Sequence, residues 1–126
     1  MNSFEELEVW KSARELRIAI SKTAKTFPIE EKYRLVDQIL RSSRSVTANI
    51  AEGFGRFHYQ ENIQFCRQAR GSLTETLEHL ICASDEGLIN QKVFETFKNM
   101  IRDCMKVLNG YIAYLIKAKS APHLSQ

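Results

Sequence analysis

The spacing of the apolar residues is the feature that most constrains this chain, because they recur every three or four positions along nearly all of it. A period of 3.6 residues is typical of amphipathic α-helices, and no segment shows the strict alternation of a half-buried strand. The pattern is interrupted before Pro28, at Gly53–Gly55 and near Gly87. The sequence therefore predicts four helices with short connections, which make neighbouring helices antiparallel.

The first two interruptions bound the first two predicted helices. The first helix is expected over residues 4–25, because the residue before a proline disfavours the helical region. The second is expected to start at Pro28, whose fixed φ suits a first helical turn. It should end at Gly53–Gly55 in a left-handed C-cap.

The third helix is expected to start near residues 58–60 and to be capped by Gly87. The fourth should start at Asn90, a favourable N-cap residue. We predict an all-α fold, an antiparallel up-down four-helix bundle. It forms one domain over residues 1–118, and residues 119–126 are expected to be a disordered tail.

The composition limits the function classes. With 126 residues and a net charge of +3, the chain has the size of one domain and is mildly basic, which permits a polyanionic partner without requiring one. Its acidic start is unlike a secretory signal, and no apolar run approaches the roughly 18 residues of a membrane span. Three widely separated cysteines form neither a disulfide framework nor a zinc motif. We expect a cytoplasmic protein without membrane, metal or cofactor.

Residue patterns that support catalysis are not found in the sequence. Di-iron sites in four-helix bundles need Glu-x-x-His on two helices, whereas His79 follows Glu75 by four positions and Glu78 by one. No Cys or Ser stands at an obvious catalytic spacing from His79. The glycines at 53 and 55 do not follow a strand, as those of a phosphate-binding loop would. We predict no catalytic residues and no enzymatic activity.

Basic residues are concentrated in the middle of the chain. Between Lys32 and Arg70 there are seven basic residues and three acidic ones, whereas Gly71–Asn90 has four acids and no Lys or Arg. Guanidinium groups suit bidentate binding of phosphates. The candidate nucleic-acid-binding residues are five arginines: Arg41, Arg44, Arg56, Arg67 and Arg70.

Three of these arginines are predicted to meet. If the second and third helices turn near residue 57, Arg44 lies level with Arg70 and one turn from Arg67, beside the seam between the two helices. Arg70 also falls on the edge of an apolar stripe, so it needs a partner within the subunit or across an interface. Nearby aromatic residues are able to stack on bases: Phe54, Phe57 and Tyr59. The pattern favours Phe54 as a core residue and Phe57 as a loop anchor.

The alternative is that these arginines are ordinary surface residues. Glu52 and Arg56 form an i,i+4 pair, and Glu15 of the first helix should lie near Arg41. Exposed pairs of this kind contribute little to stability and do not indicate a binding site.

The fourth helix shows a second apolar face. Its apolar side chains cover an arc of about 200°, whereas a stripe that faces one core needs only about 100°. The residues at the edges of this arc are predicted to contact another subunit: Phe94, Met105, Tyr114 and Ile116.

The segment before the second glycine break is predicted to be mainly architectural. Asn49 and Glu52 lie at its polar boundary and should bond to the turn, to the start of the third helix or to a neighbouring subunit. Ala48 and Ala51 permit close packing of the second and third helices, with Gly71 as the expected counterpart.

Three segments carry a family resemblance: LEVWKSA (7–13), TFPIEEKYRLVDQILRSSRSVTANIAEGFGR (26–56) and FCRQARGSLTETLEHL (65–80). Through them the chain resembles the bacterial four-helix-bundle proteins encoded within intervening sequences of 23S rRNA genes. The resemblance implies a four-helix protomer and a ring-shaped homopentamer. More distantly, the chain is similar to accessory proteins of diversity-generating retroelements, which work with a reverse transcriptase and its RNA.

One segment departs from the family pattern. Family members commonly have a basic pair with alanines where this chain has RSSRS at 41–45. The serines dilute the positive charge, and Ser42 and Ser45 are expected on the polar side of the second helix.

Two functions follow from these observations. The first is a non-enzymatic, oligomeric, ring-shaped protein that binds RNA or DNA, or a nucleoprotein, through its arginines. The second is a protein-interaction scaffold that acts as an accessory subunit of a retroelement reverse transcriptase. An uncharacterised hydrolase is a third class, but no residue constellation points to it.

Overall fold

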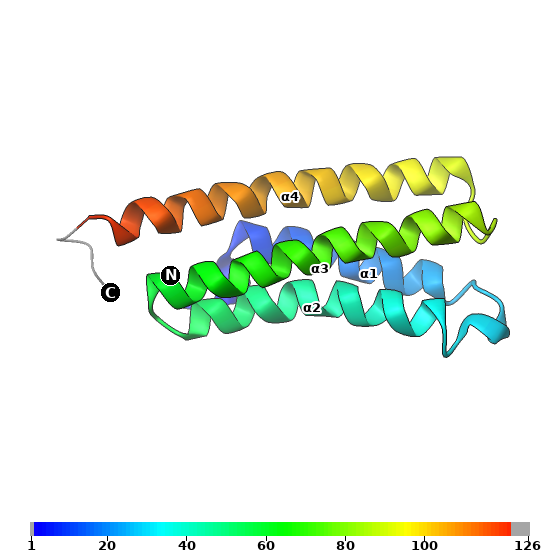
Figure 1. Cartoon of the computed structure of the whole chain (residues 1–126), viewed down its shortest axis with the longest axis horizontal. Coiled ribbons are helices and arrows are strands. Elements are labelled where there is room, and N and C mark those ends of the chain that lie inside the picture. Colours follow the sequence, from blue (N-terminus) through cyan, green and yellow to red (C-terminus); the bar gives the residue numbers. More distant parts are fainter. Residues whose placement is uncertain (1, 122–126) are drawn as a thin grey trace.

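The computed structural model describes residues 2–121 and contains four long helices (Figure 1). They are α1 (Glu8–Ala24), α2 (Leu35–Gly55), α3 (Tyr59–Asp85) and α4 (Gln91–Lys119). Two short 3₁₀ helices, η1 (Phe4–Glu6) and η2 (Ile29–Glu31), precede α1 and α2. The predicted tail lies outside the described residues from position 122 onward.

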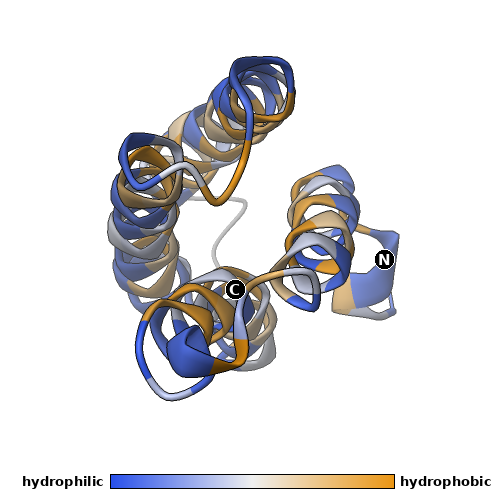
Figure 2. Cartoon of the chain, turned by 90° about the vertical axis from the view of Figure 1, so that its right-hand side faces the viewer, coloured by the Kyte–Doolittle hydropathy of each residue, from blue (hydrophilic) through white to orange (hydrophobic). Residues whose placement is uncertain are grey.

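The helices form an antiparallel bundle in which each one packs against its neighbours in the chain, and α4 also packs against α1. The contact between α2 and α3 is the most extensive, and that between α1 and α4 is the least. The view along the bundle shows apolar residues mainly on the surfaces that face the interior (Figure 2). The predicted all-α four-helix bundle is confirmed.

The core follows the apolar periodicity of the sequence. The side chains of Leu16, Ile39, Ile50, Leu73 and Leu108 are all at most 1% exposed. Burying an aliphatic side chain of this size contributes about 1.5–3 kcal/mol to stability. The buried apolar faces of the four helices therefore stabilise the bundle.

The end of α2 differs from the prediction. Gly53 and Gly55 are both helical, and the chain continues to a C-cap at Arg56 with right-handed helical φ and ψ. The residue with positive φ is Phe57, at 57°. The helix ends at Gly55, as predicted, but the predicted left-handed glycine cap is wrong, because the positive φ falls on Phe57.

The other helix ends are closer to the prediction. Gly87 does have positive φ, at 73°, and the Asn90 side chain accepts a hydrogen bond from the Val93 backbone N–H at 2.8 Å. The second long helix begins at Leu35 rather than at Pro28, because η2 and a turn intervene. Tyr33, in this turn, is 84% exposed.

Gly53 permits the close approach of α2 and α3. A Cβ atom built on it would lie 2.8 Å from both Asn62 Oδ1 and Phe65 Cβ, closer than such atoms pack. Gly71, the predicted counterpart, is exposed, and a Cβ there would meet nothing within 4 Å. The prediction that Gly71 permits close packing of α2 and α3 is therefore wrong, and Gly53 is the glycine that does so.

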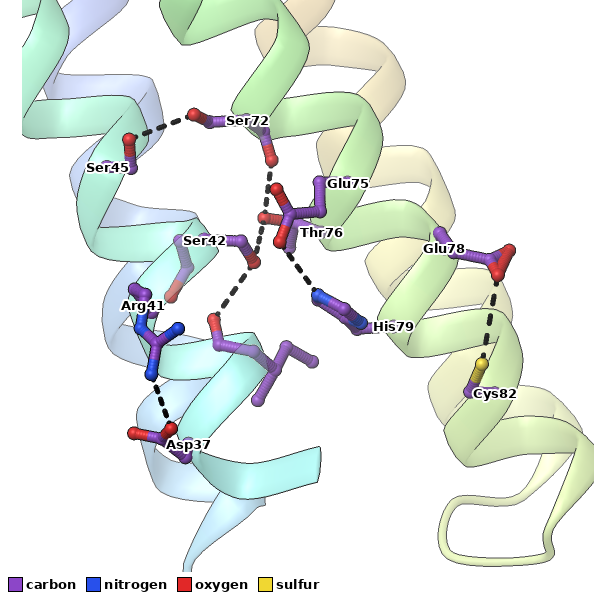
Figure 3. Close-up of polar contacts among 12 residues, drawn as sticks. Asp37, Arg41, Ser42, Ser45, Ser72, Glu75, Thr76, Glu78, His79 and Cys82 are labelled. Atoms are coloured by element: carbon purple, nitrogen blue, oxygen red, sulfur yellow. Dashed lines mark hydrogen bonds and ion pairs between the residues drawn. The ribbon is translucent and has the colours of Figure 1, made fainter. Parts of the chain in front are cut away.

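Hydroxyl groups connect α2 and α3 at the seam shown in Figure 3. Ser42 is buried, and its Oγ lies 2.8 Å from Thr76 Oγ1, which donates to the Ser72 carbonyl. Ser72 donates to Ser45 Oγ at 2.9 Å. The expectation of Ser42 on the polar side is wrong, because the serine belongs to the contact between the two helices.

Candidate nucleic-acid interface

Two of the five predicted arginines are paired within their own helix. Arg41 Nη2 lies 2.6 Å from Asp37 Oδ2, the pair drawn in Figure 3. Arg56 lies 3.8 Å from Glu52 and 5.1 Å above the Phe65 ring. Arg41 has Asp37, rather than the expected Glu15, as its carboxylate partner.

Arg70 crosses to the other side of α3. Its Nη1 donates to Asn109 Oδ1 of α4 at 2.9 Å, so the expected partner lies within the subunit. The neighbour of Arg70 is thus α4 rather than α2. Arg67, one turn earlier, is exposed.

Arg44 lies on the flank of α2 that faces away from α3. At 100° per residue it is about 100° around the helix from Ser45 and about 160° from Ser42, and both serines bond to α3. The predicted cluster of Arg44, Arg67 and Arg70 at the α2–α3 seam is therefore not formed.

The helix next to Arg44 on this side is α1. Leu7 and Phe54 line one pocket at the end of the bundle, so both lie near the same end of the two antiparallel helices. Arg17 follows Leu7 by ten residues, and Arg44 precedes Phe54 by ten residues. Both lie about 15 Å from that end at 1.5 Å per residue, so the two guanidinium-bearing residues share one level.

Arg17 is also on the correct flank of α1. Ala19 and Thr23 border α4, in a groove shared with Phe97 and Met100. Arg17 lies about 160° and 120° around α1 from these two residues, on the side toward α2. Its Nε atom is buried and has no hydrogen-bond partner among the described residues.

Arg14 and Trp10 extend this surface along α1. The Arg14 guanidinium carbon lies 5.7 Å from the centre of the Trp10 ring, which packs edge-on against Phe4 at 5.2 Å. We call Trp10, Arg14, Arg17 and Arg44 the arginine face. Within residues 2–121, its three arginines have no carboxylate at ion-pair distance. Sequence reasoning missed α1, although Trp10, Arg14 and Arg17 have the i, i+4, i+7 spacing of one helix face.

A second basic surface lies along α3 and α4. Its groove has a volume of about 500 Å³ and an apolar floor of Leu77, Ile101 and Met105. Three cationic side chains line the same groove: Lys98, Arg102 and Lys106. A groove that combines an apolar floor with cations suits a protein segment better than a nucleic-acid backbone.

The four predicted subunit-contact residues divide between two flanks of α4. Three of them follow one another at intervals of eleven residues and therefore fall on nearly one line along the helix: Phe94, Met105 and Ile116. Tyr114 lies on the opposite flank, where its ring stacks on Tyr111 at 6.3 Å. Ile116 and Tyr114 are exposed, whereas Phe94 and Met105 are half-buried.

The predicted polar boundary residues act locally. Asn49 Nδ2 donates to the carbonyl and to Oγ of Ser45 at 2.9 and 3.0 Å, so it does not bond to the turn or to the start of α3. Glu52 is the partner of Arg56. Gly55 has open space around its Cβ position.

The titratable groups of the core favour neutral forms. Burial raises the pKa of Cys66 to about 12 and also raises the pKa of Cys104, which keeps both thiols protonated and unreactive.

His79 Nε2 lies 3.0 Å from Glu75 Oε2. Among residues 2–121, no group of three His, Cys, Asp or Glu side chains is placed to hold a metal ion. Over the same residues, none of the helices has the length and apolar character required to cross a membrane.

Comparison with known proteins identifies the family. The family model for the 23S rRNA-intervening sequence protein matches residues 5–110. The chain belongs to this family.

A solved structure has the same architecture as this intervening-sequence family member. It is a protein of unknown function from the S23 ribosomal protein family of Bacteroides thetaiotaomicron, 26% identical, with a TM-score of 0.76. The match covers 82% of this chain and 97% of the other. Comparison with curated proteins gave no match.

The family match covers both basic surfaces. The arginine face and the groove cations all lie within residues 5–110, whereas Tyr114 and Ile116 lie beyond them.

Proposed function

We propose that this protein is a non-enzymatic, oligomeric four-helix bundle that binds RNA through the arginine face. The observation that supports the proposal best is the set of three arginines, Arg14, Arg17 and Arg44, that have no carboxylate partner in the part of the chain that the structure describes. Arg17 is half-buried and its Nε has no acceptor within residues 2–121, which is costly, whereas Arg14 and Arg44 are exposed. A phosphate oxygen is an acceptor that guanidinium groups bind strongly. An RNA backbone supplies such oxygens at regular intervals.

Arg14 keeps its guanidinium free of an internal carboxylate partner. Glu5 and Glu15 border the same part of α1, but within residues 2–121 no ion pair joins either of them to Arg14. Trp10 holds the Arg14 guanidinium against its ring, which limits the side-chain entropy lost when a ligand binds. The face thus presents at least one guanidinium group, that of Arg14, that is positioned before binding.

The other four predicted arginines have different roles in this proposal. Arg41 lies one turn from Arg44 and can assist, but a phosphate would compete with Asp37 for it. Arg67 and Arg70 lie on α3, away from α1, and Arg70 holds α4 through Asn109. Arg56, at the end of α2, is half-exposed and only loosely paired.

Oligomerisation completes the proposal. We place the contact between copies on the line formed by Phe94, Met105 and Ile116, which includes one residue, Met105, of the floor of the α3–α4 groove. A ring of five copies would repeat the arginine face around an axis, so that weak single-site affinity is multiplied through effective concentration.

A second candidate function rests on the α3–α4 groove. Its apolar floor and its three cations fit an acidic amphipathic helix of a partner protein. On this reading the protein is a scaffold, for example an accessory subunit of a reverse transcriptase.

The test is a titration of fluorescent single-stranded RNA with purified protein at low salt, with the mass measured by sedimentation. Binding by an oligomer, weakened tenfold or more by Arg14→Gln with Arg44→Gln, supports the proposal. Absence of binding at low salt would refute it. Capture of a reverse transcriptase that survives nuclease treatment would favour the scaffold.

A further inference from the structure

The end of the bundle formed by the α2–α3 turn and the last turns of α4 contains an aromatic pocket of about 460 Å³. It is lined by Leu7, Phe54, Phe57, Tyr59, Asn62, Tyr111, Tyr114 and Leu115. Its volume lies in the range of ligand pockets, and it combines apolar walls with a few polar groups, as such pockets do. We propose that this pocket binds one unpaired nucleobase of an RNA strand, an inference that rests on the proposed RNA binding.

The walls of the pocket offer flat ring surfaces. The rings of Tyr111 and Tyr114 are nearly parallel, with 15° between their planes. Phe57 is 67% exposed and Tyr114 is 60% exposed, so both have free ring surface for a further planar group. Stacking of a base on an aromatic ring is the usual way in which proteins bind single-stranded nucleic acid.

The backbone at Phe57 supports a functional role for this ring. A bulky residue with φ of 57° is strained, and such strain persists chiefly where the surroundings or a function maintain it. The Phe57 ring lies 6.4 Å from Phe54 and remains mostly in solvent. It is therefore not the buried loop anchor that the sequence favoured, and it stands where a ligand in the pocket would meet it.

The polar groups of the pocket match the edge of a base. Asn62 is buried and donates to the Tyr111 hydroxyl at 3.1 Å. That hydroxyl keeps its own proton for a ligand acceptor. The hydroxyls of Tyr59 and Tyr114 form no hydrogen bond with any residue in 2–121. A base has donors and acceptors on its edge to satisfy such groups, whereas a phenylalanine or leucine of a partner protein has none.

The charges around the pocket agree with a nucleotide. No charged side chain lines it, which suits a neutral ring. Arg56 precedes Phe57 and is only loosely paired with Glu52, at 3.8 Å, so the phosphate next to the bound base would compete with Glu52 for it. Arg14 and Arg17 lie roughly 10 and 15 Å along α1 from Leu7, a span that a few nucleotides bridge.

The test uses Phe57→Gly in the full chain, because glycine adopts a positive φ without strain. Tyr114→Phe serves as a second variant that removes only a hydroxyl, and Tyr33→Ala, at the other end of the bundle, is the matched control. Phe57→Gly should weaken single-stranded RNA binding roughly five- to hundredfold. The salt dependence of the remaining binding should not change, since no charge is removed. Equal RNA affinity of Phe57→Gly and the control would overturn the proposal.

A second measurement separates this proposal from RNA binding by the arginines. Adenosine, guanosine, cytidine and uridine carry no phosphate, so their titration at millimolar concentration reports the pocket alone. NMR shifts at the Asn62 side-chain amide and at the tyrosine rings, lost in Phe57→Gly, are expected even if RNA itself does not bind. Shifts elsewhere, or none with any nucleoside, would contradict a base site.

Discussion

Arg70 of α3 and Asn109 of α4 are joined by a hydrogen bond of 2.9 Å between Nη1 and Oδ1. The bond spans the seam between the two helices, and Arg70 is half-buried there, whereas Arg67 is exposed. Arg70→Ala should therefore lower the free energy of unfolding by about 1 kcal/mol, through the lost bond and the lost packing of the side-chain stem.

Arg67→Ala is the matched control, because it removes the same charge from the same helix. We expect a change within about 0.5 kcal/mol. Urea denaturation of both variants measures the difference, and identical midpoints would show that the bond to Asn109 has no structural role.

Gly53 is the point where α2 and α3 come closest. Gly53→Ala places a Cβ atom 2.8 Å from Asn62 Oδ1 and from Phe65 Cβ, and 3.2 Å from the Asn62 carbonyl oxygen. Two of these atoms cannot move without the backbone of α3, so we expect a loss of about 1–3 kcal/mol.

Gly71→Ala tests the same substitution in open space. It should stabilise the protein by roughly 0.5–1 kcal/mol, because alanine favours a helix interior and nothing blocks its methyl group. Thermal melting of the two variants should shift in opposite directions. A stable Gly53→Ala protein would mean that the helices are not held as closely as described.

Cys66 predicts how stability depends on alkaline pH. Burial raises the pKa of its thiol to about 12, whereas the thiol of an unfolded chain titrates near about 8.5. Above about pH 8.5 the unfolded state loses a proton that the folded state keeps. The free energy of unfolding is therefore highest below this pH and falls as the pH rises above it. The loss should approach about 1.4 kcal/mol per pH unit.

Cys66→Ala separates this effect from other groups that titrate in the same range, such as Cys104, whose pKa is also raised by burial. Urea denaturation between pH 8 and 10 should show a steeper decline for the native chain than for the variant. Parallel curves would exclude Cys66 as a source of the pH dependence.

The sequence was sufficient for the helices and the core, because both depend on a local period. Ile50 and Leu73 could be assigned to the interior from spacing alone, and both are buried. The left-handed cap predicted at the end of α2 was wrong, because glycine is permissive of both helix and turn. Gly53 is helical and packs closely against Asn62 and Phe65, and the sequence carries no local mark of that contact.

The candidate site was harder to predict, because it depends on which neighbour each helix face meets. Arg44 was expected to meet residues of α3, although its flank of α2 faces α1. The segment WKSARELR at residues 10–17 already spaced Trp10, Arg14 and Arg17 on one helix face. The sequence did not show how α2 is rotated about its axis relative to α1 and α3. The contacts of Ser42 and Ser45 with α3 define this rotation in the structure.

The central claim is that RNA binds to the arginine face, and its most direct test is the salt dependence of RNA affinity. For single strands, the slope of log K against log salt changes by about 0.7 for each phosphate contact. Replacing Arg14, Arg17 and Arg44 together by glutamine should therefore reduce the slope by about 2. The same replacement of Lys98, Arg102 and Lys106 removes equal charge and should leave the slope nearly unchanged. A slope that falls for the α3–α4 variant but not for the arginine-face variant would contradict the account.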